Sequence, residues 1–276
     1  MSSTPVAKKK STGLQFKVLY LRRIIQAVFV AIVAYVGVQH FVIGGGPTGA
    51  PSFDAFCPFG GVASLWSILT TGSMLQKTNL SNLVLLLATL ATALVAGRFF
   101  CGWICPFGTV QEWFSRSVSW LTGKRLPLSM PASIDRPLRY VKFVVLAAVI
   151  GATIWAGSLV FAEVCPYRAL FSAEFTTLGL VVFGAVALGS LLFERFWCKY
   201  LCPLGAILAV FNKVSPLKIT TDTSACFTCD KCARTCPMNI TDRPERIDSL
   251  ECIRCLECVE SCPKEGALEI EMRLLG

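Results

Sequence analysis

Four long apolar stretches occupy most of the first three quarters of the chain. They run from Ile24 to Ile43, Leu80 to Gly97, Phe143 to Ala162 and Phe175 to Phe193, and none contains Asp, Glu, Lys or Arg. Roughly 20 helical residues are needed to cross the apolar layer of a bilayer. Buried helices of a soluble protein usually carry a polar stripe, and these stretches carry none. The pattern therefore predicts four membrane-spanning helices.

Basic residues are concentrated on one side of these helices. They precede the first stretch (Lys8, Lys9, Lys10, Lys17, Arg22, Arg23) and fill the segment between the second and third (Arg98, Arg116, Lys124, Arg125, Arg136, Arg139). Lys and Arg stay preferentially in the cytoplasm. We therefore expect residues 1–23 to form a basic cytoplasmic tail and both termini to lie in the cytoplasm, with the chain in a bacterial inner membrane.

The membrane part is written twice. Each copy has an apolar stretch, a Cys-Pro pair, a second apolar stretch, an arginine and a Cys-x3-Cys-Pro motif, with cysteines at Cys57, Cys101 and Cys105, then at Cys165, Cys198 and Cys202. Proline is favoured at the first position of a helix, so we expect each Cys-Pro pair at a helix start. The predicted fold of residues 24–215 is an all-α four-helix membrane domain built from two parallel repeats.

The cysteines of the two repeats have several possible roles. Cys101, Cys105, Cys198 and Cys202 are expected near one another at the cytoplasmic side, where four thiolates could hold an additional cluster or metal. Cysteine also packs simply as a small apolar residue. Cys57 and Cys165 are redox candidates that begin on the opposite side, where a disulfide is one option. The sequence leaves these alternatives open.

The last segment, residues 216–276, has a different composition, with charged residues and two runs of four cysteines. They are Cys226-x2-Cys229-x2-Cys232-x3-Cys236-Pro237 and Cys252-x2-Cys255-x2-Cys258-x3-Cys262-Pro263. In this pattern the fourth cysteine of each run ligates the other cluster. One [4Fe-4S] cluster is therefore expected on Cys226, Cys229, Cys232 and Cys262, and the second on Cys252, Cys255, Cys258 and Cys236.

Zinc and disulfides are weaker explanations for these runs. Zinc sites use pairs of Cys-x2-Cys without tandem runs of four, and a reducing cytosol disfavours disulfides. We expect a small cytoplasmic ferredoxin-like α+β domain that depends on its clusters to fold.

Composition agrees with a membrane protein. The chain is 54% hydrophobic and 16% charged, with a mean hydropathy of +0.62. Its net charge of +9 is accounted for by topology and by attraction to anionic lipids, so no nucleic-acid partner is expected.

The single histidine, His40, lies beside Gln39 near the outer end of the first apolar stretch. Quinol releases protons when it is oxidised, so these residues are candidates for a quinol site. A hydrogen-bonded histidine at the membrane surface is the alternative. One histidine cannot supply both ligands of a bis-histidine haem.

The basic tail, the four apolar stretches, the two Cys-x3-Cys-Pro motifs and the C-terminal cysteine runs together resemble NapH-type membrane iron–sulfur quinol dehydrogenase subunits. The resemblance extends from about Leu19 to Leu268. It implies a subunit that takes electrons from the membrane quinone pool and passes them, through an iron–sulfur or cytochrome partner, toward a periplasmic reductase of the nitrate type.

The same core also resembles NosR-type proteins and CcoG-type copper reductases. A second hypothesis is therefore a metal reductase or assembly factor whose Cys-x3-Cys-Pro thiols bind and reduce copper. A purely regulatory redox sensor would need an output domain, and the sequence contains none that we recognise.

Overall fold

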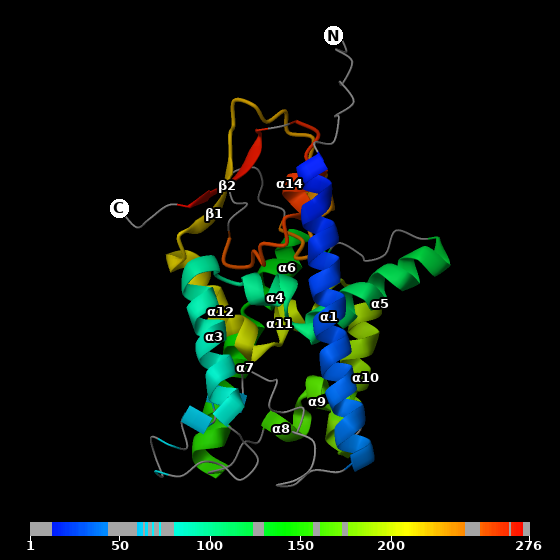
Figure 1. Cartoon of the computed structure of the whole chain (residues 1–276), viewed down its shortest axis with the longest axis vertical. Coiled ribbons are helices and arrows are strands. Elements are labelled where there is room, and N and C mark those ends of the chain that lie inside the picture. Colours follow the sequence, from blue (N-terminus) through cyan, green and yellow to red (C-terminus); the bar gives the residue numbers. More distant parts are fainter. Residues whose placement is uncertain are drawn as a thin grey trace.

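The computed structural model is a set of upright helices with a small cysteine-rich part at one end (Figure 1). It describes residues 13–43, 60–62, 64–65, 68, 72, 80–123, 130–156, 161–172, 176–240, 249–264 and 266–272. Cys57 and its neighbour Pro58 lie outside these residues, so their expected helix start stays a prediction.

Helices form most of the described elements. In chain order these are α1 (Gly13–Ile43), α3 (Leu80–Ala96), α4 (Phe99–Trp103), α5 (Pro106–Thr122), α6 (Ala132–Leu138), α7 (Val141–Ala156), α8 (Phe161–Val164), α9 (Pro166–Ser172), α10 (Thr177–Leu192), α11 (Phe196–Tyr200), α12 (Pro203–Val214), β1 (Leu217–Thr221), α13 (Lys231–Arg234), α14 (Glu257–Ser261) and β2 (Leu268–Met272).

Two of the described helices are long and apolar enough to cross a membrane. They are Val18–Ile43 and Ala132–Ala156, while Asn82–Ala96, Thr177–Leu192 and Pro203–Val214 are shorter apolar helices. Only 17% and 6% of the apolar windows of the two long helices are buried. A soluble protein rarely exposes apolar surface on this scale, so these helices are suited to lipid.

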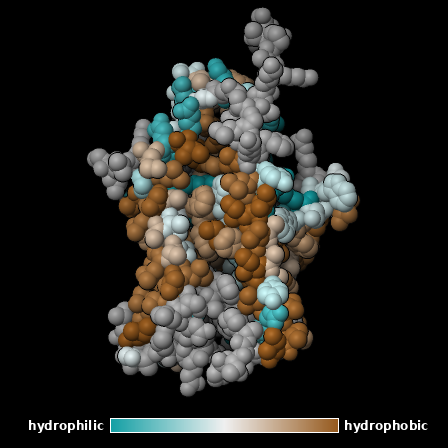
Figure 2. All heavy atoms as spheres, in the orientation of Figure 1, coloured by the Kyte–Doolittle hydropathy of each residue, from teal (hydrophilic) through white to brown (hydrophobic). Residues whose placement is uncertain are grey.

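Apolar side chains face outward on the shorter helices too. Val84 and Leu94 of α3, and Val181 and Leu188 of α10, are each more than half exposed. Figure 2 shows hydrophobic side chains along the upright helices and hydrophilic ones gathered at the end that carries the strands. The molecule thus has an apolar part formed by helices α1 and α3 to α12, which we call the shaft, and a polar part formed by the elements from β1 to β2, which we call the head.

The helix boundaries differ from the expected apolar stretches in two places. The third stretch was expected to reach Ala162, but α7 ends at Ala156 and α8 begins at Phe161. α1 begins at Gly13, so Arg22 and Arg23 belong to the helix and not to a separate tail. Arg22 is moreover buried. A charged side chain in this position needs partners, and these partners lie in other parts of the chain.

Helices start at the described Cys-Pro pairs, as expected. α5 begins at Pro106 after Cys105, and α12 begins at Pro203 after Cys202. α9 begins at Pro166 after Cys165. Proline lacks the N–H that would be unpaired at this position anyway, which is the physical reason for the match.

The cysteine-rich head is closed by a short antiparallel sheet. β1 pairs with β2 in a register that sets Ile219 opposite Ile270. β1 follows α12 directly, and α14 packs against α1. The head is thus attached to the shaft by both sequence and packing.

Candidate functional site

The eight cysteines of the head lie around two pockets. One is lined by Cys226, Cys229, Cys232 and Cys262, the other by Cys236, Cys252, Cys255 and Cys258. These are the two sets expected from the crossed ligand pattern, including the exchange of the fourth cysteine between runs.

The backbone around each pocket repeats the same geometry. Thr228 and Asp230 in the first run, and Arg254 and Leu256 in the second, all have left-handed backbone conformations with φ between 49° and 64°. Non-glycine residues adopt this conformation at a cost, and such residues concentrate at functional sites. Since each pair brackets a middle cysteine, Cys229 or Cys255, both runs wrap around their pocket in the same way.

The donor sets fit iron–sulfur clusters. Four thiols line each pocket, which matches the ligation of a [4Fe-4S] cluster by four cysteines. Within the part of the chain that the structure describes, no three His, Cys, Asp or Glu side chains converge closely enough to hold a single metal ion. The thiols line pockets instead, and this arrangement suits a group larger than one ion.

The cysteines of the two Cys-x3-Cys-Pro motifs are brought together below the head. Cys101 and Cys198 are buried, while Cys105 and Cys202 are partly buried. Burial raises the pKa of the Cys105 and Cys202 thiols, and the nearby thiols of Cys198 and Cys101 raise these pKa values further. Neighbouring thiols in this setting ionise together only when nearby positive charge, from cationic side chains or a bound metal, compensates their own.

Local hydrogen bonds support the thiolate form of two of these cysteines. The Gly205 N–H donates to Cys202 Sγ at 3.4 Å, and Gln111 Nε2 donates to Cys198 Sγ at 3.6 Å. Hydrogen bonds to a charged group favour that group's charged form. The four thiols therefore form a second kind of candidate site, which we call the membrane cysteine site.

Two buried arginines link the motifs reciprocally. Arg98, which precedes Cys101, donates from Nη2 to the Cys198 carbonyl at 3.2 Å, and Arg195, which precedes Cys198, donates from Nη1 to the Cys101 carbonyl at 2.6 Å. Each arginine precedes its cysteine by three residues. The equivalent arginines thus tie each motif to the other and hold positive charge beside the thiols.

The two arginines pair with carboxylates from different parts of the chain. Arg195 pairs with Glu112 of α5 at 2.6 Å, whereas Arg98 pairs with Glu251 of the head at 2.8 Å. Lys142 of α7 also pairs with Glu251. Both arginines are fully buried, so these carboxylates supply charge partners that buried guanidinium groups require.

A third buried arginine, Arg22 of α1, connects the same parts. Its guanidinium pairs with Glu112 at 2.7 Å and with Glu257 of the head at 2.7 Å, and its Nε donates to the Gly102 carbonyl at 3.0 Å. The head, α1 and α5 therefore meet at one guanidinium.

Comparison with known protein families agrees with both kinds of site. A family model described as a 4Fe-4S binding domain matches residues 78–128 and 175–221, the two segments that contain the Cys-x3-Cys-Pro motifs. A second, described as a 4Fe-4S dicluster domain, matches residues 218–265. No solved structure is significantly similar to the chain.

Several curated proteins are similar along most of the chain. The protein MJ0749 of Methanocaldococcus jannaschii is 35% identical over 68% of this chain and 70% of its own length. YccM of Escherichia coli K12 is 28% identical over 80% of this chain and 64% of its own length. The ferredoxin-type protein NapH of Escherichia coli K12 is 27% identical over 61% of this chain and 57% of its own length.

The chain belongs to the NapH-type and NosR-type family of membrane ferredoxins. This membrane ferredoxin is accordingly an iron–sulfur electron-transfer protein of the ferredoxin type.

The remaining site candidates lie deeper in the shaft of the membrane ferredoxin. Cys165 packs against the same buried apolar cluster as Cys105 and Cys202. Gln39 donates to the Tyr35 hydroxyl at 3.0 Å. Gln39 and His40 are 17 and 18 residues beyond Arg22 in α1, which at 1.5 Å per residue places them about 25 Å along the helix axis from Arg22. The quinol-site candidates thus lie at the opposite end of α1 from the arginine that contacts the first Cys-x3-Cys-Pro motif.

Sequence reasoning missed the buried ionic residues of the membrane ferredoxin. In the sequence, Arg22 and Arg98 indicate only the topology, and no pattern gives Glu112, Glu251 or Glu257 a role. The available signal was the repetition itself, since Arg98 and Arg195 stand at the same distance from their cysteines.

Proposed function

We propose that this membrane ferredoxin is an electron-transfer subunit that oxidises quinol and passes the electrons to a redox partner protein. The head carries two [4Fe-4S] clusters, one on Cys226, Cys229, Cys232 and Cys262 and the other on Cys236, Cys252, Cys255 and Cys258. The membrane cysteine site carries a third cluster. These groups supply reversible one-electron chemistry.

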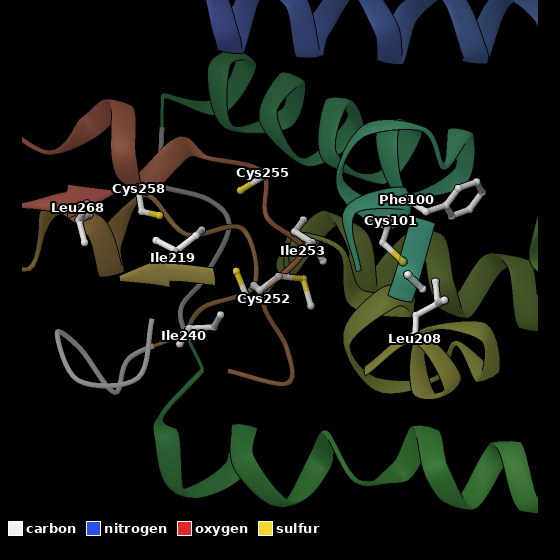
Figure 3. Close-up of a cluster of buried hydrophobic side chains, with 12 residues drawn as sticks. Phe100, Cys101, Leu208, Ile219, Ile240, Cys252, Ile253, Cys255, Cys258 and Leu268 are labelled. Carbon is white, nitrogen blue, oxygen red and sulfur yellow. The ribbon is translucent and has the colours of Figure 1, made fainter. Parts of the chain in front are cut away.

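One observation carries the proposal. The membrane cysteine site lies where the shaft meets the head, and Cys101 belongs to the same buried cluster as Cys252, Cys255 and Cys258 (Figure 3). Cysteines of the shaft and cysteines of the head thus pack in one buried cluster. A protein that passes electrons from the membrane to the head needs its redox groups to lie this close together.

The proposed topology has four spans in two parallel repeats, with both termini in the cytoplasm. The outward apolar side chains of α1, α3, α7 and α10 support the four spans, and the reciprocal bonds of Arg98 and Arg195 support the repeats. Quinol binds toward the far end of α1, where His40 is the candidate proton acceptor and Gln39 is a second quinol-site candidate. The redox partner is an iron–sulfur or cytochrome subunit. The names of the relatives do not say which of the two it is.

Iron analysis and low-temperature spectroscopy of anaerobically purified full-length protein test the cofactor assignment. Cys229→Ser and Cys255→Ser should each lose one head cluster, and a Cys101→Ser, Cys198→Ser double variant should lose the third. Cys165→Ser changes a cysteine outside all three sets and should keep the parent's iron content. A double variant with unchanged iron and spectrum would eliminate the third cluster.

A reductant test separates the proposal from the copper hypothesis. Addition of a menaquinol or ubiquinol analogue should reduce the clusters of the parent protein. Stoichiometric copper bound by the membrane cysteine site, with no reduction of the clusters by quinol, would favour a metal reductase or assembly factor instead.

A further inference from the structure

A short segment of the head, residues 249–255, lies against the shaft, and we call it the docking loop. Its backbone carbonyl groups are held by shaft side chains. Asn212 Nδ2 donates to the Leu250 carbonyl at 3.0 Å and to the Cys252 carbonyl at 2.7 Å. Trp103 Nε1 donates to the Arg254 carbonyl at 3.0 Å. Hydrogen bonds from the shaft therefore hold the backbone of the docking loop both before and after Ile253.

The closest approach of the docking loop to the shaft is at Gly102. A Cβ atom added to Gly102 would collide with the Ile253 carbonyl oxygen. The Gly102 carbonyl is itself fixed, because it accepts hydrogen bonds from Arg22 Nε and Gln26 Nε2, both at 3.0 Å. Two backbones thus meet here with no side chain between them, and neither can withdraw freely.

This contact joins neighbours of two candidate cluster ligands. Gly102 follows Cys101 of the membrane cysteine site, and Ile253 follows Cys252 of the head. All but Gly102 belong to one buried cluster, and in Figure 3 Ile253 projects between the head cysteines and Cys101. A short route through covalent bonds and one backbone contact therefore connects the two sets of thiols.

The duplication shows that glycine here is specific to one copy. The position equivalent to Gly102 in the second motif is Lys199, which is buried with its ammonium 5.8 Å from the Tyr200 ring centre. A lysine could not occupy position 102, because its Cβ alone would displace the docking loop. The two motifs differ, then, at the residue where the head touches the first of them.

We infer that the Gly102–Ile253 contact is the electron-transfer junction between the membrane cysteine site and the Cys252 side of the head, with Gly102 as its positioning residue. The inference rests on the proposed function. One electron leaves the group held by the membrane cysteine site, which is oxidised, and arrives at the group held by the Cys252 set of the head, which is reduced. No bond is made or broken in this step. The electrons come from quinol, whose oxidation to quinone is a separate step that also releases protons, with His40 as the candidate acceptor.

Gly102→Ala tests the junction in the full-length protein with its clusters. The added methyl group must push the docking loop away by about 1 Å to restore van der Waals separation. Gly151→Ala is the matched control, because a Cβ at Gly151 meets nothing within 4 Å. Iron content, the magnetic interaction between reduced clusters and the rate of head reduction by a quinol analogue are measured for each variant.

We expect Gly102→Ala to keep the parent's iron content but to weaken the magnetic interaction and to slow head reduction several-fold, since electron transfer slows as the separation between donor and acceptor grows. Gly151→Ala should match the parent in all three measurements. Parental magnetic interaction and rate in Gly102→Ala would overturn the inference.

A second measurement stands if Gly102→Ala does not fold. In the parent, magnetic interaction with the third cluster should broaden the spectroscopic signal of the cluster on the Cys252 set. This signal should be narrower in the Cys101→Ser, Cys198→Ser double variant, while the signal of the cluster on the Cys226 set stays unchanged. A parent with a third cluster but without this interaction overturns the junction and leaves the proposed function intact. A double variant with parental iron content overturns the third cluster itself, and the junction with it.

Discussion

Replacing Glu251 with glutamine removes a negative charge that faces two buried cations. Glu251 Oε2 accepts a hydrogen bond from Arg98 Nη1 at 2.8 Å, and Oε1 accepts one from Lys142 Nζ. Both cationic side chains are fully buried. Burial alone would raise the pKa of Glu251, but Arg98 and Lys142 outweigh burial and lower the pKa. The carboxylate is therefore ionised at neutral pH.

The expected loss is large because glutamine leaves the two cations without their counter-charge. Removing one partner of a buried ion pair typically destabilises a protein by about 3–5 kcal/mol. The lower value corresponds to about a 100-fold shift in equilibrium. Since Glu251 belongs to the docking loop and its partners to the shaft, we expect this loss to appear as undocking of the head.

Hydrogen exchange and thermal release of the clusters measure this undocking. In Glu251→Gln, the backbone amide hydrogens of the docking loop should exchange faster than in the parent, and the clusters should be released at a lower temperature. Glu269→Gln, on an exposed position of β2, is the matched control and should resemble the parent. If Glu251→Gln and Glu269→Gln showed the same exchange and the same midpoint, the ionic attachment of the head would be refuted.

Two further predictions concern pH and topology. Burial alone would raise the pKa of Glu112, but Arg195, Arg22 and Arg116 lower it to about 2 from its ordinary 4.5; a depressed pKa stabilises the fold above pH 4.5 and loses this contribution as pH falls toward 2. The difference in thermal midpoint between the parent and Glu112→Gln should therefore stay constant from pH 7 to pH 5 and shrink only below about 4.5, whereas shrinkage already above pH 5 would contradict the assignment. A membrane-impermeant thiol reagent should label Cys57 in intact cells and a Lys213→Cys variant only after permeabilisation, and the reverse pattern would invert the topology.

Which head cysteines line a pocket together was predictable because short spacings leave few alternatives. Two residues between successive cysteines limit which thiols can surround one pocket, and the crossed fourth cysteine follows from the tandem runs. Helix starts at Cys105 and Cys202 were predictable for an equally local reason, the proline that follows each cysteine. Local chemistry decides these features, and a single sequence contains it.

The buried ion pairs of Arg22 and Arg98 were not predictable, because their partners are far apart in the chain. Arg22 is 90 residues from Glu112 and 235 residues from Glu257, and Arg98 is 153 residues from Glu251. Charged residues are mostly exposed, so an arginine at the end of an apolar helix is ordinarily a topology signal. These arginines become interior residues through packing with distant parts of the chain, including Glu257 and Glu251 of the head.

The contacts with the head make the two Cys-x3-Cys-Pro motifs unequal, although their sequences are duplicated. Arg98 and Arg195 are equivalent by position, yet Arg195 finds its carboxylate within the shaft and Arg98 finds it in the docking loop. Gly102 and Lys199 are equivalent too, yet only glycine allows the close approach of Ile253. Both differences fall on the first motif. Charge pairing and close contact therefore both attach the head to the first motif, which is the route that the proposed electron transfer uses.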